Sequence, residues 1–140
     1  MIFNFFIILS LVVLALAVNK VPLPGRLYSW QCLHLGESVF SPKGCYELKL
    51  QDDGNLVIQS RFFSHPVWAA GTHNKNVYRV CMQGDGNLVI ENRSYRPVWA
   101  AGSFNHPGAR VIMQDDGNLV IYEYASNQHL WSSQTSGSSC

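Results

Sequence analysis

One eight-residue segment occurs three times in this chain and constrains its fold more than any other feature. The copies begin at Gln51, Gln83 and Gln114, share seven of their eight residues, and all end in Leu-Val-Ile. Their asparagines are 32 and 31 residues apart, and a tryptophan follows each asparagine after 12 or 13 residues. A period of this length indicates repeated units that bury one shared core.

Each repeat predicts a β-hairpin and a third strand. Alternating apolar residues precede the segment, an Asp-Gly pair supplies its turn, and a second strand continues as Asn-Leu-Val-Ile. The first strands are expected at 46–51, 78–83 and 109–114, and the third at 66–72, 97–103 and 129–135. Each third strand carries one tryptophan that we expect in the core: Trp68, Trp99 and Trp131. The sequence therefore predicts an all-β prism or barrel with pseudo-threefold symmetry.

The repeats, at about 45–76, 77–107 and 108–135, fit one domain over 18–140, which suits a chain of 140 residues. Residues 19–29 are expected to form an extended lead-in, and one or two short strands are expected from Trp30 to the first repeat. Trp30 itself is a candidate for exposure. The formal charge is +1 and no basic stripe occurs, which argues against nucleic acid as a partner.

Residues 1–17 resemble a secretory signal peptide. The run from Ile2 is almost wholly apolar and ends in Ala15-Leu16-Ala17, a small-x-small cleavage pattern, although no Lys or Arg precedes it. An uncleaved membrane anchor is the alternative, but the run is at the short end for spanning a bilayer. We expect a secreted, extracellular protein without stable membrane insertion after the leader is cleaved.

Four cysteines follow the leader, and in a secreted chain an even number predicts disulfides. None has CxxC spacing and the five histidines do not cluster with them, which argues against zinc. The pairing stays open among Cys32, Cys45, Cys81 and Cys140. Because Cys140 ends a Ser/Gly-rich tail, it could pair with Cys32 or bridge to a second chain. Asn92-Arg93-Ser94 is an N-glycosylation sequon.

The outer face of each hairpin presents two amides, one carboxylate, one valine and the residue after the isoleucine. Repetition of the Gln and the Asn is more than a turn requires. Carboxylates accept hydrogen bonds and amides both donate and accept, which suits the hydroxyls of a hexopyranose, and valine could lie against its C–H face. The sequence shows no nucleophile with a base beside it, so binding is favoured over catalysis. The Asp-x-Asp-Gly-Asn pattern looks like a calcium-binding loop but lacks the glutamate that such a loop has at its twelfth position, so no cofactor is expected.

The pattern Gln-x-Asp-x-Asn-x-Val-x-Tyr resembles the carbohydrate-site motif of the bulb-type mannose-binding lectins, also called monocot or snowdrop-type lectins. The resemblance covers about residues 30–135. It implies a β-prism II fold, with three four-stranded antiparallel sheets and central tryptophans. It also implies that Gln and Tyr bond mannose O3 and O4, that Asp and Asn hold O2, and that Val packs on the ring. The implied positions are Gln114, Asp116, Asn118, Val120 and Tyr122; Gln51, Asp53, Asn55 and Val57; and Gln83, Asp85, Asn87 and Val89.

Only the third copy keeps the tyrosine, as Tyr122. The first has Gln59 there, and the second has Glu91, a carboxylate expected to be flexible and to lack the reach of the phenol. We therefore rank the third site first, the first site next and the second site last. Gly54 stands where many family members have a cysteine, so the family's disulfide pairing does not carry over.

The resemblance implies a binder of mannose-rich glycans that acts through several weak sites, and defence is the usual role in the family. A homodimer or higher oligomer is expected, and Cys140 could lock it covalently. Two alternatives stay open. One is that the scaffold has lost sugar binding and recognises a protein, which Gln59 and Glu91 would favour. The other is a hydrolase or an inhibitor, for which the sequence offers no matching set of functional residues.

Overall fold

The structure, a computed structural model, describes residues 25–137 and 139–140. The predicted leader (1–17) and the start of the lead-in lie outside the described residues. In the described part the chain forms strands and turns, and it contains no helix that is long and apolar enough to cross a membrane.

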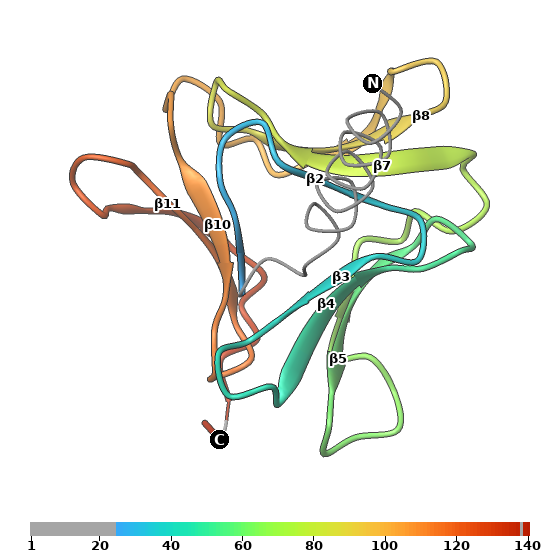
Figure 1. The fold of residues 1–140 in the computed structure, drawn as a ribbon, viewed down its shortest axis with the longest axis vertical. Helices are drawn as coiled ribbons and strands as arrows, with labels where there is room; N and C mark the ends of the chain where they lie inside the picture. The colour runs from blue at the N-terminus through green and yellow to red at the C-terminus, as the bar shows by residue number, and fades with distance from the viewer. Residues whose placement is uncertain (1–24, 138) are drawn as a thin grey trace, which may run out of the picture.

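Within the described residues, twelve short strands make up three antiparallel sheets of four strands each. They are β1 (Arg26–Leu27), β2 (Cys32–His34), β3 (Ser38–Phe40), β4 (Tyr46–Leu50), β5 (Leu56–Ser60), β6 (Trp68–Ala69), β7 (Val77–Met82), β8 (Leu88–Asn92), β9 (Pro97–Ala100), β10 (Arg110–Met113), β11 (Leu119–Tyr122) and β12 (His129–Ser132). The sheets surround a central axis as the three sides of a triangular prism (Figure 1). The predicted β-prism II architecture is confirmed.

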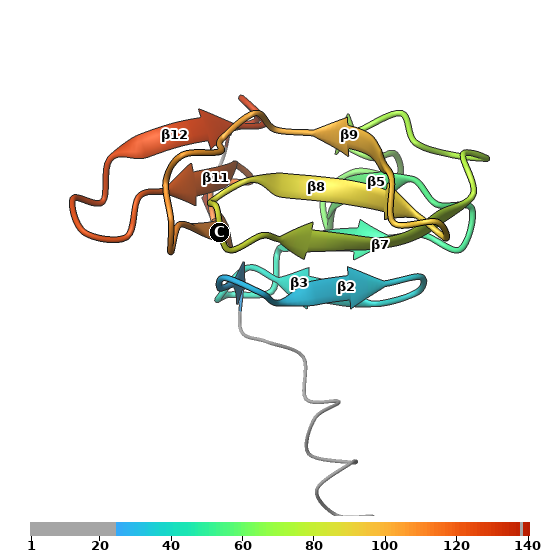
Figure 2. The ribbon, with the colours of Figure 1, turned by 90° about the horizontal axis from the view of Figure 1, so that it is seen from above.

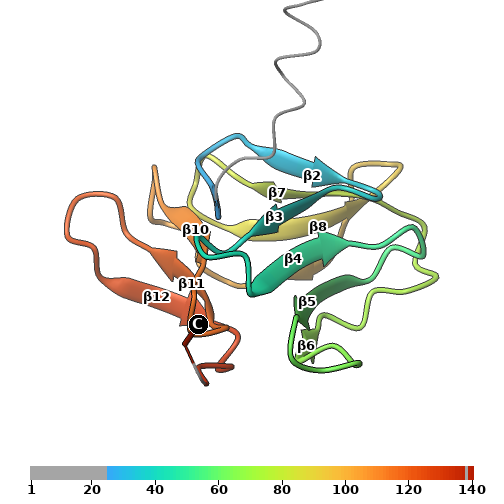
Figure 3. The ribbon, with the colours of Figure 1, turned by 60° about the horizontal axis from the view of Figure 1, so that its bottom comes forward.

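Each sheet combines one repeat with one strand of the lead-in. The strand orders are β3-β4-β5-β6, β2-β7-β8-β9 and β1-β10-β11-β12, and Figure 3 shows the first sheet in that order. The one or two short strands expected between Trp30 and the first repeat are confirmed as β2 and β3, and β1 is a further strand within the stretch that was expected only to be extended. These strands contain only two or three residues, too few to show an alternating pattern, and they form by pairing with β10, β7 and β4.

The core is a stack of apolar layers along the prism axis, and each sheet contributes to every layer. The first strand of each sheet contributes Leu27, Leu33 or Val39 to the layer at one end of the stack. The hairpins add the fully buried leucine and isoleucine of each repeated segment. These are Leu56, Ile58, Leu88, Ile90, Leu119 and Ile121. Burial of each such side chain stabilises the fold by about 1.5–3 kcal/mol. The inward direction predicted for these residues is confirmed.

The three tryptophans close one end of this stack. Trp68, Trp99 and Trp131 contact one another edge to face, with ring centroids 5.9, 6.1 and 5.7 Å apart. Their strands β6, β9 and β12 are the last in each sheet, and Figure 2 shows β9 and β12 along one edge of the molecule. The rings therefore pack on the core as predicted, but they stay partly exposed.

Two disulfides link separate parts of the chain. Cys32 and Cys81 are cross-strand partners on β2 and β7, and Cys45 pairs with Cys140. The expectation that Cys140 pairs with Cys32 or with a second chain was wrong. The tail is held on the third hairpin, where the Gly137 amide donates to the Asp116 carbonyl at 2.7 Å. This contact directs the last residues toward Cys45.

Candidate functional site

The three repeated segments fold into the same turn. In the first copy the Gln51 amide donates to the Asn55 carbonyl at 2.9 Å and the Gly54 amide donates to the Gln51 carbonyl at 2.9 Å. Gly54 has a φ of 86°, which residues other than glycine rarely adopt. The equivalent glycines have φ values of 91° and 86°. The turn is a three-residue loop that ends in a left-handed glycine, as the Asp-Gly pair predicted.

The aspartate of each copy closes this turn with one carboxylate oxygen. The Oδ1 atoms of Asp53, Asp85 and Asp116 accept the amide N–H two residues later at 2.9, 3.0 and 2.9 Å. The second oxygen of each carboxylate has no hydrogen-bond partner among the described residues. The turn thus fixes the position of each carboxylate, and its second oxygen is left as an acceptor for a ligand.

The asparagine of each copy has a structural role that the sequence interpretation missed. Asn55 Oδ1 accepts the amides of Gly71 and Thr72 at 3.1 and 3.0 Å, and Asn87 binds Gly102 and Ser103 in the same way. This oxygen ties the loop after the tryptophan strand to the hairpin. Repetition of the asparagine therefore has a structural cause, and only its Nδ2 group is left to donate to a ligand.

The valines lie on the outer face but offer little surface. Val57, Val89 and Val120 are absent from the core cluster, yet they are only 1%, 4% and 2% exposed. Their cross-strand neighbours cover them: Lys49 and Ala69 flank the first, and Cys81 and Ala100 flank the second. The expectation of an accessible apolar patch was wrong, because side chains of adjacent strands close over it.

The third copy brings its predicted residues together. Gln114 Nε2 donates to the phenol oxygen of Tyr122 at 2.5 Å, across the outer face of β10 and β11. The guanidinium of Arg110, the cross-strand partner of Tyr122, lies 5.9 Å from the centre of the tyrosine ring. Asp116 is half-buried, whereas Asp53 and Asp85 are exposed. The tyrosine and the glutamine are thus fixed against each other, on the hairpin whose turn contains the half-buried aspartate.

The loop beside the third copy carries a negative charge. The Glu123 carboxylate forms hydrogen bonds with the Ser126 hydroxyl and with the imidazole of His106. These bonds, that of Ser126 more than that of His106, hold the pKa of Glu123 below its ordinary value. Because this shift favours the ionised form, Glu123 is a carboxylate at neutral pH.

Glu91 in the second copy is fixed, not flexible. It is 8% exposed, its Oε2 accepts from Arg79 Nε at 2.9 Å, and its Oε1 accepts from Gln83 Nε2 at 3.4 Å. The earlier expectation was wrong because Arg79 is the cross-strand partner of Glu91 and neutralises it. Glu91 takes the place of the tyrosine and keeps a contact to the motif glutamine.

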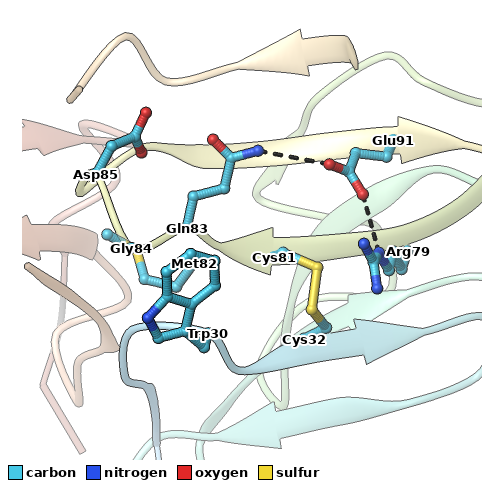
Figure 4. Close-up of a pocket in the computed structure, with 9 residues that line it drawn as sticks. All are labelled: Trp30, Cys32, Arg79, Cys81, Met82, Gln83, Gly84, Asp85 and Glu91. Carbon is cyan, nitrogen blue, oxygen red and sulfur yellow. Dashed lines mark hydrogen bonds and ion pairs between the residues drawn. A yellow bond between two sulfur atoms is a disulfide. The ribbon is translucent and has the colours of Figure 1, made fainter. Parts of the chain in front are cut away.

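The second copy also lines a pocket of about 350 Å³. Figure 4 shows Asp85, Gln83 and Glu91 along one side, with Trp30 and the Cys32–Cys81 disulfide along the other. Trp30 is 80% exposed, which agrees with the sequence expectation. Sequence reasoning did not connect Trp30 or Arg79 with this site. The sequence signal that could have pointed to this pocket is Gly84, which stands where the other two copies have an aspartate.

The first copy has a less organised outer face. Glu47 is the cross-strand partner of Gln59, and no hydrogen bond joins the Gln51 and Gln59 side chains in the described structure. A second pocket, of about 340 Å³, lies at the other side of this turn and is lined by residues that include Asp53, Asn74 and Arg93. The structure thus gives the first copy the fewest preformed contacts.

The remaining candidates are placed outside these sites. The amide oxygen of Asn92 accepts the N–H groups of Ser94 and Arg96 at 2.9 and 3.0 Å, so it shapes its own turn, and glycosylation there stays a prediction. No group of three or more His, Cys, Asp or Glu side chains in the described ranges is arranged to hold a metal ion.

Comparison with protein-family models gave no match, and neither did comparison with curated protein sequences. Comparison with solved structures gave strong matches. The chain is 37% identical to the monomeric monocot mannose-binding lectins of Gastrodia elata, with 80% of this chain and 98% of that chain covered and a TM-score of 0.71.

Two further structures are similar. The chain is 34% identical to the mannose-specific agglutinin of snowdrop (Galanthus nivalis), solved with methyl-α-D-mannoside, over 75% of this chain and 97% of that one, with a TM-score of 0.64. It is 27% identical to a lectin of Marasmius oreades, over 81% of this chain and 93% of that one, with a TM-score of 0.74.

Proposed function

The chain belongs to the family of monocot, or bulb-type, mannose-binding lectins, and we propose that it binds mannose-containing glycans through the outer face of its third hairpin. Proteins of this family bind carbohydrate and do not convert it. The observation that supports the proposal most is the preformed pair of Gln114 and Tyr122 beside the half-buried Asp116.

Each polar group of this site has a role toward a pyranose. Asp116 offers the carboxylate oxygen that the turn leaves unpaired, and Asn118 offers its Nδ2 donor, so both can hold one hydroxyl. The Gln114 carbonyl oxygen and the Tyr122 hydroxyl can form hydrogen bonds with a second and a third hydroxyl of the sugar. Because Val120 is covered, hydrogen bonds carry this binding and the apolar contact contributes little.

Such a site binds one sugar weakly. Each exposed hydrogen bond contributes about 0.5–1.5 kcal/mol net, and four or five of them give about −4 kcal/mol, which corresponds to a Kd of about 1 mM. Useful affinity then requires several sites to engage a clustered glycan at once. The three hairpins lie on three sides of the prism, which supports our proposal that one chain offers more than one such site.

A homodimer or higher oligomer would raise this avidity further. Because Cys140 is bonded to Cys45, the association we propose is non-covalent. Secretion after removal of residues 1–17 is also part of the proposal, and two disulfides suit an oxidising compartment. Recognition of foreign glycans in defence is the role we propose for the secreted protein.

Retention on mannose-agarose tests the proposal. We expect the wild-type protein to be retained and to elute with free mannose, and we expect Asp116→Ala to elute earlier. Wild-type protein that is retained no better than Asp116→Ala would contradict the proposal for the third hairpin. Wild-type protein that binds no glycan on an array would instead favour the alternative, a member of this fold that recognises a protein.

A further inference from the structure

We propose that the second hairpin forms a separate sugar pocket, in which the indole of Trp30 replaces the motif valine as the surface that contacts a neutral hexopyranose. The inference rests on the proposed function, because it assigns a second mode of binding to the same class of ligand. It concerns the pocket of about 350 Å³ between Trp30 and Glu91.

The backbone of Trp30 has a conformation that is rare for a bulky residue. Its φ is 72°, and its amide donates to the Met82 carbonyl at 2.7 Å. The corresponding residue of the first sheet is Gly36, with a φ of 84° and the same bond to Leu50. A bulky side chain rarely adopts this region, and its indole stays 80% exposed. A strained, exposed aromatic residue points to a ligand.

The second copy departs from the motif where the indole lies. Gly84 stands where the other copies have Asp52 and Asp115, and a Cβ atom at Gly84 would overlap the ring of Trp30. Loss of the aspartate therefore makes room for the indole directly against the turn. The two departures, a tryptophan in a glycine-like conformation and a glycine in place of aspartate, create one surface together.

This surface has an apolar side and a polar side. Trp30 and the Cys32–Cys81 disulfide form the first, and Asp85, Gln83 and Glu91 form the second (Figure 4). Arg79 holds Glu91 in place at 2.9 Å, so its carboxylate is preorganised. In the third copy the corresponding polar groups have no indole beside them.

The two sides match the two faces of a pyranose. The C–H face of the ring can lie on the indole while hydroxyls at its edge reach the carboxylates and the amide. The lining of the pocket holds two carboxylates, Asp85 and Glu91, and one arginine, Arg79, which is already paired with Glu91. An acidic sugar is therefore disfavoured, and a neutral hexopyranose fits.

The test follows the indole N–H signal of Trp30 in the nuclear magnetic resonance spectrum of the full secreted chain. The probes are methyl α-D-mannoside, methyl β-D-glucoside and methyl β-D-galactoside. We expect a saturable shift of this signal with at least one of them. The shift should persist in Asp116→Asn, in which the third site is weakened.

Two variants separate binding from folding. Trp30→Gly suits the local backbone, so we expect an unchanged or higher thermal midpoint but an affinity about tenfold weaker for that sugar, the loss that about 1.4 kcal/mol of contact energy would give. Gly84→Asp should displace the indole and weaken binding similarly. Phe63→Ala, which removes another exposed aromatic ring, should leave the affinity unchanged.

The outcomes distinguish the two proposals. If the glycan binds and Asp116→Asn weakens it, but the Trp30 signal does not move and Trp30→Gly binds as wild type, the inference about this pocket is overturned and the proposed function stands. If the wild-type protein binds none of the sugars and no glycan on an array, both are overturned.

Discussion

Gln114 Nε2 donates a hydrogen bond of 2.5 Å to the hydroxyl of Tyr122, so these two side chains are positioned against each other before any ligand arrives. Preorganisation of this kind lowers the entropy that binding must otherwise overcome. The second copy keeps the geometry with Glu91 in place of the tyrosine, whereas the first does not. The copies therefore differ in preorganisation as well as in composition.

Replacement of Tyr122 by phenylalanine tests this pair. The variant keeps the ring, and with it the contact to Arg110, but it loses the hydroxyl. We expect mannoside binding at the third site to weaken by about 1 kcal/mol, or about fivefold, with little change in stability. Isothermal titration calorimetry checks this. Tyr124→Phe, at an exposed loop residue nearby, is the matched control, and equal affinities for the two variants would contradict the role of the hydroxyl.

Replacement of Asn55 by alanine tests the structural role of the motif asparagine. The variant leaves the amides of Gly71 and Thr72 without their acceptor. We expect the free energy of unfolding to fall by about 1–3 kcal/mol. Urea unfolding measures it, with Gln51→Ala as the control that should change little. A variant as stable as the wild type would show that the loop finds other acceptors.

Replacement of Arg79 by methionine tests the ion pair of the second copy. Glu91 is nearly buried and would lose its cationic partner, whereas Arg79 keeps part of its side chain in solvent. We expect a loss of about 1–2 kcal/mol in the free energy of unfolding, less than for a fully buried pair. Chemical denaturation checks this, and Arg96→Met, at an exposed site, provides the comparison. No loss would mean that Glu91 is held mainly by Gln83.

Replacement of Cys140 by serine tests the second disulfide. The bond closes a sequence separation of 95 residues, and chain entropy predicts that it contributes about 4.7 kcal/mol. We expect a clearly lower thermal midpoint. Non-reducing gels of the wild-type protein should show a monomer, and a disulfide-linked dimer there would contradict the intramolecular pairing.

The hairpins and the tryptophan strands were predictable because each carries a local signal. Apolar residues alternate before every turn, and Gly54 and its two equivalents stand where a positive φ is needed. The first strand, β1, carries no such signal. Arg26–Leu27 becomes a strand only because β10 lies beside it, and this pairing spans more than eighty residues.

The candidate site was predicted in its residues but not in their environment. Side-chain type alone could not show that Val120 is covered, because Ile112 and Ser132, on two other strands, flank it. It also could not show that Glu91 has Arg79 opposite it. Both properties follow from strand register, which a list of residues does not contain.

The central claim is that the third hairpin binds mannose, and titration of the protein with methyl α-D-mannoside tests it most directly. Side-chain amide signals of Gln114 and Asn118 should shift saturably with a Kd of about 1 mM, the value expected for four or five exposed hydrogen bonds. The shifts should be lost in Asp116→Asn. Wild-type signals that stay unchanged at saturating mannoside would contradict the claim.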